Sequence, residues 1–412
     1  MSLKRELGVF GATMMGLGSI IGTGVFVSIG IAAGIAGPAV VIAIAMAAFV
    51  ATCNGLNSAQ LAANHPVSGG TYEYGYRYLN PTLGFTAGWM FLCAKTASAA
   101  AAALGFAGYL LNLTSQDARW LVPIAVGTVI ALTTVVLSGI RLSNRVNIAI
   151  VSVTLISLLA FIVAGAPQVS ASRLTMRIEP ASLLHACALM FVAYTGYGRI
   201  ATLGEEVVEP HRTIPKAIII TLAISMLIYI GVAIVAIGAA GVDKVQAATT
   251  KNSAPLVIVA REFPIRVHWL VSLGAMTAML AVLLNLLLGL SRVLLAMGRR
   301  GDMPSITSKL AVSVLVVGGI VAALAATGSV KTTWTFSAFT VLIYYAVTSI
   351  AALRLSESER LYGKAWGWIG LLSCLGLAFA IDWQVWSMGL GILAIGLLWH
   401  WARAGMSQTE RA

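Results

Sequence analysis

The chain consists of long apolar stretches separated by short segments that carry charged residues, proline or glycine. A helix needs about 20 apolar residues to cross a hydrocarbon layer of roughly 30 Å. The spacing of the breaks therefore predicts twelve membrane-spanning helices. Their predicted bounds are 8–34, 38–63, 82–112, 118–139, 146–166, 180–203, 215–240, 267–297, 310–328, 332–353, 363–381 and 383–402. The longest gap, 241–266, is too short for a soluble domain, so we expect one transmembrane domain over residues 1–412.

The composition also indicates a polytopic, all-α membrane protein. Of the 412 residues, 59% are hydrophobic and 10% are charged, whereas a soluble globular protein has roughly 25% charged residues. The same composition excludes a disordered chain, which needs few apolar residues and a high density of charge. The lipid bilayer is therefore the first partner that the sequence predicts.

The formal net charge of +12 comes from 26 Lys and Arg residues against 14 Asp and Glu residues. The basic residues are scattered singly between apolar stretches and form no stripe, so we expect no nucleic-acid partner. With the N-terminus placed inside, sixteen of them fall in cytoplasmic segments and eight on the opposite side. Because Lys and Arg accumulate in cytoplasmic loops, we predict cytoplasmic termini and a multi-pass protein of the plasma (inner) membrane.

Cysteine and histidine form no recognisable cluster in the sequence. The four cysteines stand alone in apolar stretches without CxxC or Cys/His spacing, so we expect no metal site, no disulfide and no cofactor. The five histidines fall in five separate segments, which disfavours a membrane-embedded enzyme. A Walker-type phosphate-binding loop is absent, which disfavours ATP-driven transport.

Two of the predicted helices are interrupted by glycine, five spans apart. The first span contains Gly-Leu-Gly-Ser-Ile-Ile-Gly-Thr-Gly from Gly16 to Gly24, and the sixth contains Tyr-Thr-Gly-Tyr-Gly-Arg from Tyr194 to Arg199. Each glycine costs a helix up to ~1 kcal/mol relative to alanine. Close packing against a neighbour would explain one such helix. Two broken helices at corresponding positions instead indicate an inverted repeat of five helices and the central site of a transporter.

Unwinding at these breaks would expose backbone groups of both polarities. Free N–H groups at Gly22, Thr23 and Gly24, with the Thr23 hydroxyl, would lie at the positive end of a helix and suit a carboxylate. Free carbonyl groups suit an ammonium or another cation. We expect such carbonyls near Ser19, Ile20, Ile21, Val192, Ala193 and Thr195. A site with both kinds of group matches a zwitterion, and an α-amino acid is the obvious one.

Four motifs, in order along residues 8–304, resemble those of the amino acid–polyamine–organocation superfamily of permeases. In this chain they read GSIIGTGVF at 18–26, PVSGGTYEY at 66–74, AYTGY at 193–197 followed by Glu205, Glu206 and Pro210 to Pro215, and GLSR at 289–292 followed by AMGR at 296–299 and Pro304. The segments beyond residue 304 match that superfamily only as apolar spans.

The resemblance implies a leucine-transporter-like fold with a 5+5 inverted repeat and about twelve transmembrane helices. The first repeat would cover 8–166, the second 180–353, and two peripheral helices 363–402. The substrate would lie between helices 1, 3, 6 and 8, and access would alternate by rocking of a helix bundle. The matching positions are Gly22, Thr23 and Gly24 for the substrate carboxylate, and the carbonyls around Ile20, Val192 and Thr195 for its amine.

Two positions bear on coupling to an ion. Lys95 stands near the middle of the third span, where a lysine costs about 2.5–3.5 kcal/mol. It is either a proton-coupling or substrate-sensing amine, or a structural amine bonded to the ends of the broken helices. Several relatives carry a lysine in helix 5 that substitutes for a sodium ion, and the matching position here is Thr154. This chain lacks that amine, so an ion site stays open.

Other candidates concern the gate and the side-chain pocket. Arg199 keeps its charge at all relevant pH values, and we expect it to pair with Glu205 or Glu206 at an inner gate, with neutralisation of carbonyls at the break as the alternative. Phe91, Tyr194 and Tyr197 are candidates for the pocket that holds the substrate side chain, and core packing explains each of them equally well.

These features predict a secondary active transporter that moves an α-amino acid by alternating access, as a proton symporter. An exchanger or exporter with the same fold is the alternative, and a channel or an enzyme fits less well. Because Lys95 and Arg199 would repel a cationic substrate, we expect a neutral amino acid, with an acidic one next. The expected partners are the amino acid, lipid and protons, and the protein is expected to be a monomer or a homodimer.

Overall fold

The computed structural model describes residues 7–65, 69–139, 144–201 and 207–409. This part of the chain is almost entirely helical, and it contains no β-strand beyond one pair of bridging residues, Leu7 and Val207. The predicted all-α polytopic fold is therefore confirmed.

Each of the twelve predicted spans forms a helix or a broken helix. Nine segments of the described chain are long and apolar enough to cross a membrane. Three shorter apolar helices complete the set: α1 (Val9–Ile20), α14 (Leu310–Ala325) and α16 (Lys364–Phe379). The other long helices are α3 (Val40–Asn64), α5 (Pro81–Thr114), α6 (Leu121–Leu137), α7 (Asn144–Gly165), α8 (Pro180–Tyr194), α10 (Pro210–Ala240), α13 (His268–Arg300), α15 (Val330–Leu353) and α17 (Trp383–Thr409).

Short helices occupy several of the connections. They are η2 (Gly37–Ala39), α4 (Thr71–Tyr78), η3 (Ala118–Trp120), η4 (Ala166–Gln168), η5 (Ala171–Leu174), α11 (Val242–Asn252), α12 (Pro255–Ala260) and η7 (Ser305–Ser308). Two of them, α11 and α12, fill the longest predicted gap, so that gap contains two short helices rather than a domain.

The first and sixth spans are broken where the glycines predicted. α1 ends at Ile20, the next two residues are not helical, and the chain resumes as a π-helix, η1 (Gly24–Ser28), that leads into α2 (Ile29–Ala36). α8 is followed by one turn of 3₁₀-helix, η6 (Thr195–Tyr197), and then by α9 (Gly198–Ala201). Such π and 3₁₀ segments inside a helix frequently mark functional sites.

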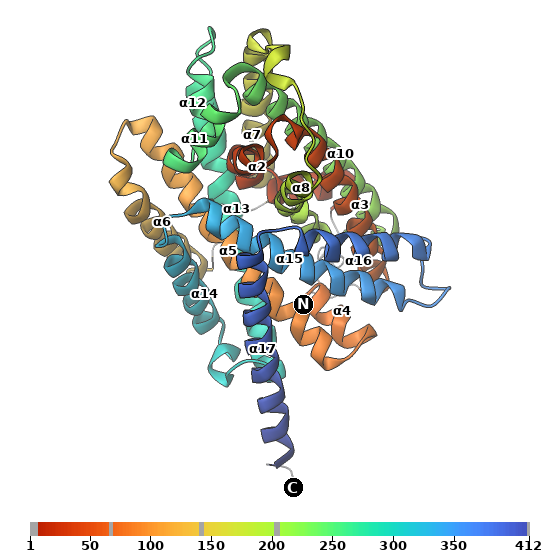
Figure 1. Cartoon of the computed structure of the whole chain (residues 1–412). Helices are drawn as coiled ribbons and strands as arrows, with labels where there is room; N and C mark the ends of the chain where they lie inside the picture. Colours follow the sequence, from red (N-terminus) through yellow and green to blue (C-terminus); the bar gives the residue numbers. More distant parts are fainter. Residues whose placement is uncertain (1–6, 66–68, 140–143, 202–206, 410–412) are drawn as a thin grey trace.

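Two sets of helices pack around these breaks, and α15 contacts members of both sets. α3 packs against α8 and α10, whereas α5 packs against α13 and α15. α4 lies between α3 and α5 in the sequence, so it joins the two sets covalently (Figure 1). The division into repeats over 8–166 and 180–353 stays a prediction.

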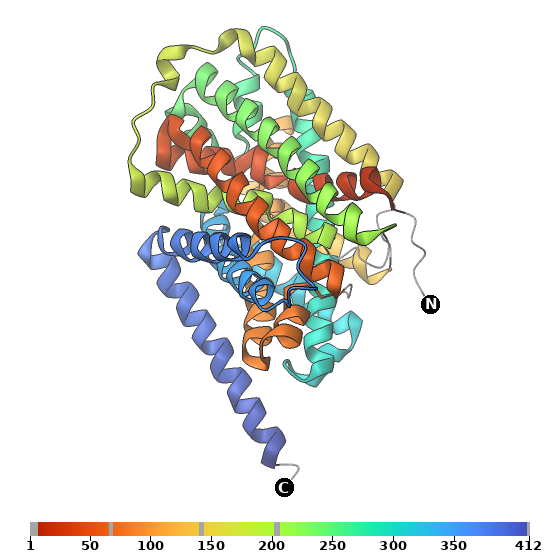
Figure 2. The ribbon, with the colours of Figure 1, turned by 90° about the vertical axis from the view of Figure 1, so that its right-hand side faces the viewer.

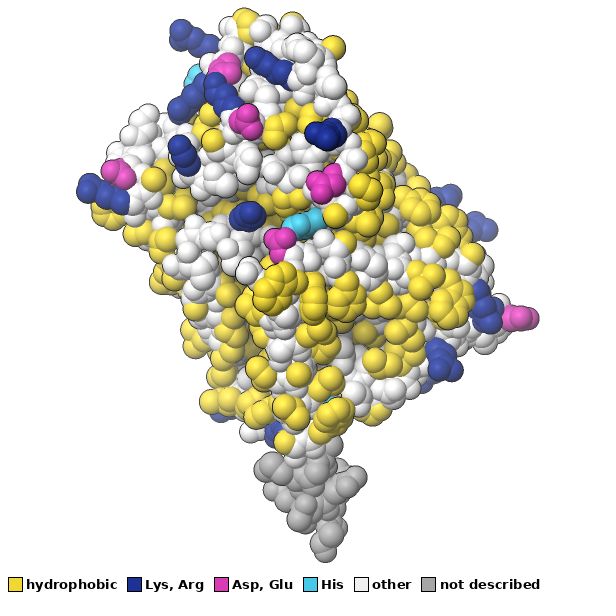
Figure 3. Space-filling view, viewed as in Figure 1, with side chains coloured by type: hydrophobic (Ala, Val, Ile, Leu, Met, Phe, Trp, Pro, Cys, Tyr) yellow, Lys and Arg dark blue, Asp and Glu magenta, His cyan; other side chains and the backbone are white. Residues whose placement is uncertain are grey.

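The last helix lies at the edge of the molecule. α17 packs on α5 and α15, and its C-terminal part then runs away from the other helices (Figure 2). Apolar side chains cover much of the middle of the face seen in Figure 3, whereas charged side chains gather at its upper end, near α11 and α12, and at its right-hand edge. This distribution is the one that a lipid environment favours, with apolar atoms toward hydrocarbon and charges toward water.

Candidate functional site

The two helix breaks touch each other through their backbones. A Cβ atom added to Gly196 would lie 2.3 Å from the carbonyl oxygen of Ser19, so no side chain fits at that position. A Cβ atom on Gly24 would lie 2.6 Å from the Cβ atom of Ala193. Glycine at these two positions therefore lets the unwound segments of the first and sixth spans meet.

A cavity of about 40 Å³ lies where the breaks meet. Its walls come from both broken helices and from α5, α13 and α15. The lining residues are Ser19, Ile20, Thr23, Gly24, Lys95, Ser98, Val192, Ala193, Thr195, Gly196, Val282, Leu286 and Trp334. The first, third, sixth and eighth spans therefore all line one cavity, and the tenth span adds Trp334.

Lys95 points from α5 to the break in the sixth span. Its side chain is buried, with 8% of the residue exposed, and its Nζ donates a hydrogen bond to the Thr195 hydroxyl at 2.8 Å. That hydroxyl in turn donates to the carbonyl oxygen of Val192 at 2.8 Å. No Asp or Glu side chain lines this cavity in the described chain. The ammonium is therefore held by a neutral hydroxyl at the break.

Unsatisfied donors lie on the first broken helix. The Thr23 hydroxyl is buried and has no hydrogen-bond partner, and Thr23 is 3% exposed. Within the described residues, the amide groups of Gly22 and Thr23 have no backbone acceptor. A buried donor without a partner costs about 1–3 kcal/mol, so this position stores a cost that a bound carboxylate would relieve.

The carbonyl groups at the breaks are already hydrogen-bonded by protein side chains. The Tyr229 hydroxyl of α10 donates to the carbonyl oxygen of Ile20 at 2.9 Å and to that of Ala193 at 3.3 Å. The Tyr345 hydroxyl donates to the carbonyl oxygen of Thr195 at 3.1 Å. Each carbonyl oxygen has two lone pairs, so these contacts use only part of its capacity. The carbonyl groups of Ile20, Ala193 and Thr195 are therefore partly used by protein donors, and their role toward a substrate amine stays a prediction.

Two aromatic candidates lie outside the cavity lining. Phe91 packs against Tyr344, with ring centroids 5.4 Å apart, and is half-buried. Tyr197 is fully buried and packs against Tyr345 at 5.3 Å. Neither ring lines the cavity, so both lie in core packing in this conformation.

The remaining predicted residues are spread around the site. Ile21 and Gly22 belong to the non-helical turn, where a Cβ atom on Gly22 would lie 2.8 Å from Val282. Thr154 is buried on α7, and its hydroxyl donates to Ile150 O of the same helix at 2.8 Å. Arg199 is half-buried on α9. The proposed partners of Arg199, Glu205 and Glu206, lie outside the described residues.

Several lining residues were missed by the sequence analysis. Ser98 lies one helical turn beyond Lys95, a spacing that points both side chains to one face of α5. Val282, Leu286 and Trp334 are apolar residues within apolar spans, so no local signal distinguishes them from residues that face lipid. Tyr229 also lies within an apolar span, so the local sequence does not indicate its position at the breaks.

Comparison with known proteins gives a consistent result. A family model described as amino acid permease matches residues 11–409. An uncharacterized transporter of Mycobacterium tuberculosis is 38% identical to this chain, over 99% of the chain and 93% of its own length. The branched-chain amino acid permease BcaP of Bacillus subtilis is 31% identical over 75% of the chain and 70% of its own length. The methylthioribose transporter of Bacillus subtilis is 29% identical over the same shares.

Proposed function

This chain belongs to the amino acid permease family, and from that premise we propose that it carries a neutral α-amino acid by alternating access, in symport with protons. The single observation that carries the proposal is the meeting of two broken helices around one cavity. Broken helices at matching positions supply backbone donors and acceptors at depth in a membrane. A substrate with both a carboxylate and an ammonium uses both sets.

The preference for a neutral side chain rests on the cavity walls. Ile20, Val192, Val282, Leu286 and Trp334 present apolar surface, and no carboxylate among the described lining residues offsets the charge of Lys95 for a cationic substrate. The relative from Bacillus subtilis that is named for branched-chain amino acids supports an aliphatic substrate. Leucine is therefore the first substrate to test, and methylthioribose is the informative contrast.

Proton coupling is assigned to Lys95. Its ammonium has a neutral partner, Thr195, on the broken sixth span. Loss of a proton from Lys95 would remove the positive charge from the break. The protonation of Lys95 would then affect the conformation of the sixth span.

We place both termini on the cytoplasmic side of the plasma membrane, and we assign the repeats to 8–166 and 180–353. An exchanger is the alternative mode, with Lys95 as a structural amine.

The test is uptake of labelled leucine by purified protein in liposomes. Uptake is compared under an inward proton gradient, an inward sodium gradient, and internal unlabelled leucine with no gradient. We expect saturable uptake driven by the proton gradient. Labelled glutamate, lysine and methylthioribose are measured in parallel to define the substrate.

Two lysine variants separate the coupling role from general damage. Lys95→Ala is expected to lose gradient-driven uptake while it keeps leucine binding and counterflow, because the substrate groups remain in place. Lys331→Ala, an exposed lysine on α15, is the matched control and should behave as the wild type. Stimulation by internal leucine alone would establish an exchanger, and absence of amino acid transport in every mode would overturn the proposed substrate class.

A further inference from the structure

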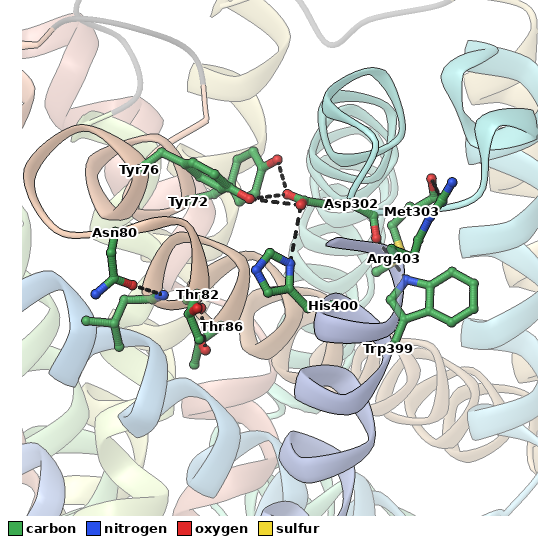
Figure 4. Close-up of polar contacts among 11 residues, drawn as sticks. Tyr72, Tyr76, Asn80, Thr82, Thr86, Asp302, Met303, Trp399, His400 and Arg403 are labelled. Carbon is green, nitrogen blue, oxygen red and sulfur yellow. Dashed lines mark hydrogen bonds and ion pairs between the residues drawn. The ribbon is translucent and has the colours of Figure 1, made fainter. Parts of the chain in front are cut away.

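A buried carboxylate just after α13 holds α4 in place. Asp302 is 7% exposed, and it accepts hydrogen bonds from the phenol groups of Tyr72 at 2.6 Å and Tyr76 at 2.8 Å (Figure 4). Both tyrosines lie on α4. Arg300 lies over the ring of Tyr76, 4.1 Å from its centroid, and pairs with Glu73 of α4 at 2.8 Å. α4 is therefore fastened to the end of α13 by several polar contacts.

α17 reaches the same carboxylate. The His400 Nδ1 atom lies 3.6 Å from Oδ1 of Asp302, and the two side chains are 12% and 7% exposed (Figure 4). The imidazole stacks on Phe85 of α5, with ring centroids 4.6 Å apart. The neighbouring Trp399 donates from Nε1 to the backbone carbonyl of Asp302 at 2.9 Å. Three elements, α4, α13 and α17, thus meet at Asp302.

The contact between His400 and Asp302 depends on charge. A separation of 3.6 Å exceeds an ordinary hydrogen bond, so the imidazole acts on the carboxylate chiefly when it is protonated. The other titratable or charged groups around the pair are Tyr72, Tyr76 and Glu73 from α4, Arg300 from α13 and Arg403 from α17. α5 contributes the uncharged Phe85.

The phenol and guanidinium groups of this cluster do not change charge near neutral pH. Burial and the Asp302 carboxylate raise the pKa of Tyr72 and of Tyr76 well above the ordinary value, so both phenols remain hydrogen-bond donors. Arg300 and Arg403 stay charged. Histidine is the side chain whose charge ordinarily changes between about pH 5 and 8.

We propose that His400 and Asp302 form a latch that fastens α4, and thereby slows the transport cycle, when His400 is protonated. α4 follows α3 and precedes α5 in the chain, so a relative movement of these two helices displaces or strains α4. In acid, the imidazolium attracts the carboxylate and holds α4 against α13 and α17. At higher pH this attraction is lost, and α4 is then held only by the hydrogen bonds from Tyr72 and Tyr76 to Asp302 and by the Arg300–Glu73 pair, so the link loosens.

The latch goes beyond the proposed function. It rests on that function only for the side of the membrane on which α4 and Asp302 lie and for the substrate used in the transport assay. With the termini in the cytoplasm, α4 and Asp302 face the cytoplasm as well. Protons that enter with the substrate would then slow further uptake, which is a form of self-limitation.

Counterflow of labelled leucine, with the same pH on both sides of the liposome, tests the latch. We expect the wild type to turn over about threefold more slowly at about pH 6 than at about pH 7.5. His400→Phe keeps an aromatic ring on Phe85 without the charge and should be fast at both pH values. His400→Lys carries a permanent charge and should be slow at both. Asp302→Asn should lose the pH dependence as His400→Phe does.

A matched control and a second readout keep the test decisive. His211→Gln changes an exposed histidine at the start of α10 and should keep the wild-type pH dependence. Thermal unfolding needs no substrate: relative to His400→Phe, the wild-type midpoint should be about 1–2 °C higher at about pH 6 than at about pH 7.5. Equal pH dependence of the wild type and His400→Phe in both measurements would overturn the latch. A midpoint difference without any leucine counterflow would support the latch and overturn the proposed substrate.

Discussion

The hydroxyl group of Tyr229 lies 2.9 Å from the carbonyl oxygen of Ile20, and through this hydrogen bond α10 holds the end of α1 at the break. The same hydroxyl lies 3.3 Å from the carbonyl oxygen of Ala193. One side chain on a continuous helix therefore bridges the unwound ends of two broken helices. The relative position of the two breaks depends on this phenol as well as on the glycines.

Replacing Tyr229 with phenylalanine should weaken substrate binding with little loss of folding. The ring stays in place, but two carbonyl groups lose a donor, and a hydrogen bond contributes about 1 kcal/mol. We expect the KM for leucine to rise about fivefold, with a smaller change in kcat. Tyr362→Phe, in the connection between α15 and α16, is the control. Equal loss of kcat and thermal stability without a change in KM would contradict a role at the breaks.

Gly196→Ala should abolish transport. The added methyl group would lie 2.3 Å from the backbone oxygen of Ser19, so the two breaks must separate. The matched control is Gly127→Ala on α6, where a Cβ atom meets nothing within 4 Å and alanine favours the helix by up to ~1 kcal/mol. Leucine uptake and thermal unfolding should show loss for the first variant and none for the second. Normal transport by Gly196→Ala would show that the breaks separate during the cycle without cost.

Thr23→Val should have opposite effects on stability and binding. The buried hydroxyl has no partner, so its removal should leave the free energy of unfolding unchanged or raise it by up to ~1 kcal/mol. Loss of a donor to a carboxylate should weaken leucine binding about tenfold, because hydrogen bonds to charged groups contribute about 1.5–3 kcal/mol. Titration calorimetry and thermal unfolding measure the two effects. Thr128→Val, whose hydroxyl bonds its own helix on α6, is the control. Unchanged affinity would remove Thr23 from the substrate site.

Lys95 and Thr195 should behave as one unit in a double-mutant cycle. Lys95→Met and Thr195→Val each break the 2.8 Å hydrogen bond between them. If this bond transmits protonation to the sixth span, each variant should reduce proton-driven uptake about tenfold, and the double variant should be no worse than either. Additive losses in uptake would show that the two residues act separately.

The loop after α15 carries a small pH-dependent contribution to stability. The hydroxyl and amide groups of Ser356 donate to the Glu359 carboxylate at 2.7 and 3.0 Å, and these bonds lower its pKa. A lowered folded-state pKa stabilises the protein above the ordinary carboxyl pKa, and the benefit disappears as the pH falls through the folded-state value. Glu359→Gln should therefore lower the unfolding midpoint slightly at neutral pH and not in strong acid. Glu357→Gln is the exposed neighbour for comparison, and a difference that grows in acid would contradict this assignment.

The spans and the two breaks could be predicted because their signals are local. Apolar length defines a membrane helix, and clustered glycines such as those from Gly16 to Gly24 weaken one at a definite place. The two breaks meet, as corresponding positions of the predicted inverted repeat would, and the repeat itself stays a prediction. The depth of Lys95 in its span predicted a protein partner, which the Thr195 hydroxyl supplies, and the choice between a coupling and a structural role stays open to experiment.

The rest depended on packing between distant segments. Tyr229 and Trp334 lie in apolar spans, and nothing in the local sequence distinguishes a residue that faces the cavity from one that faces lipid. Asp302 reads as a loop charge, and it is buried only because α4 and α17 converge on it from positions 230 and 98 residues away, at Tyr72 and His400. Phe91 and Tyr197 show the converse, since aromatic residues near the breaks packed into the core.

The use of main-chain atoms at the breaks has a consequence for how selectivity can evolve. Peptide groups are the same whatever the codon, so point mutations leave the groups that would grip the common end of an amino acid largely intact. In the proposed site, much of the wall around the variable end comes from side chains on other helices, Ser98, Val282, Leu286 and Trp334. Single-base changes there would alter which amino acid the proposed site accepts, and they would leave unchanged the main-chain groups that bind the carboxylate and the amine. The substrate specificity of such a protein can therefore change during evolution while the protein remains a transporter.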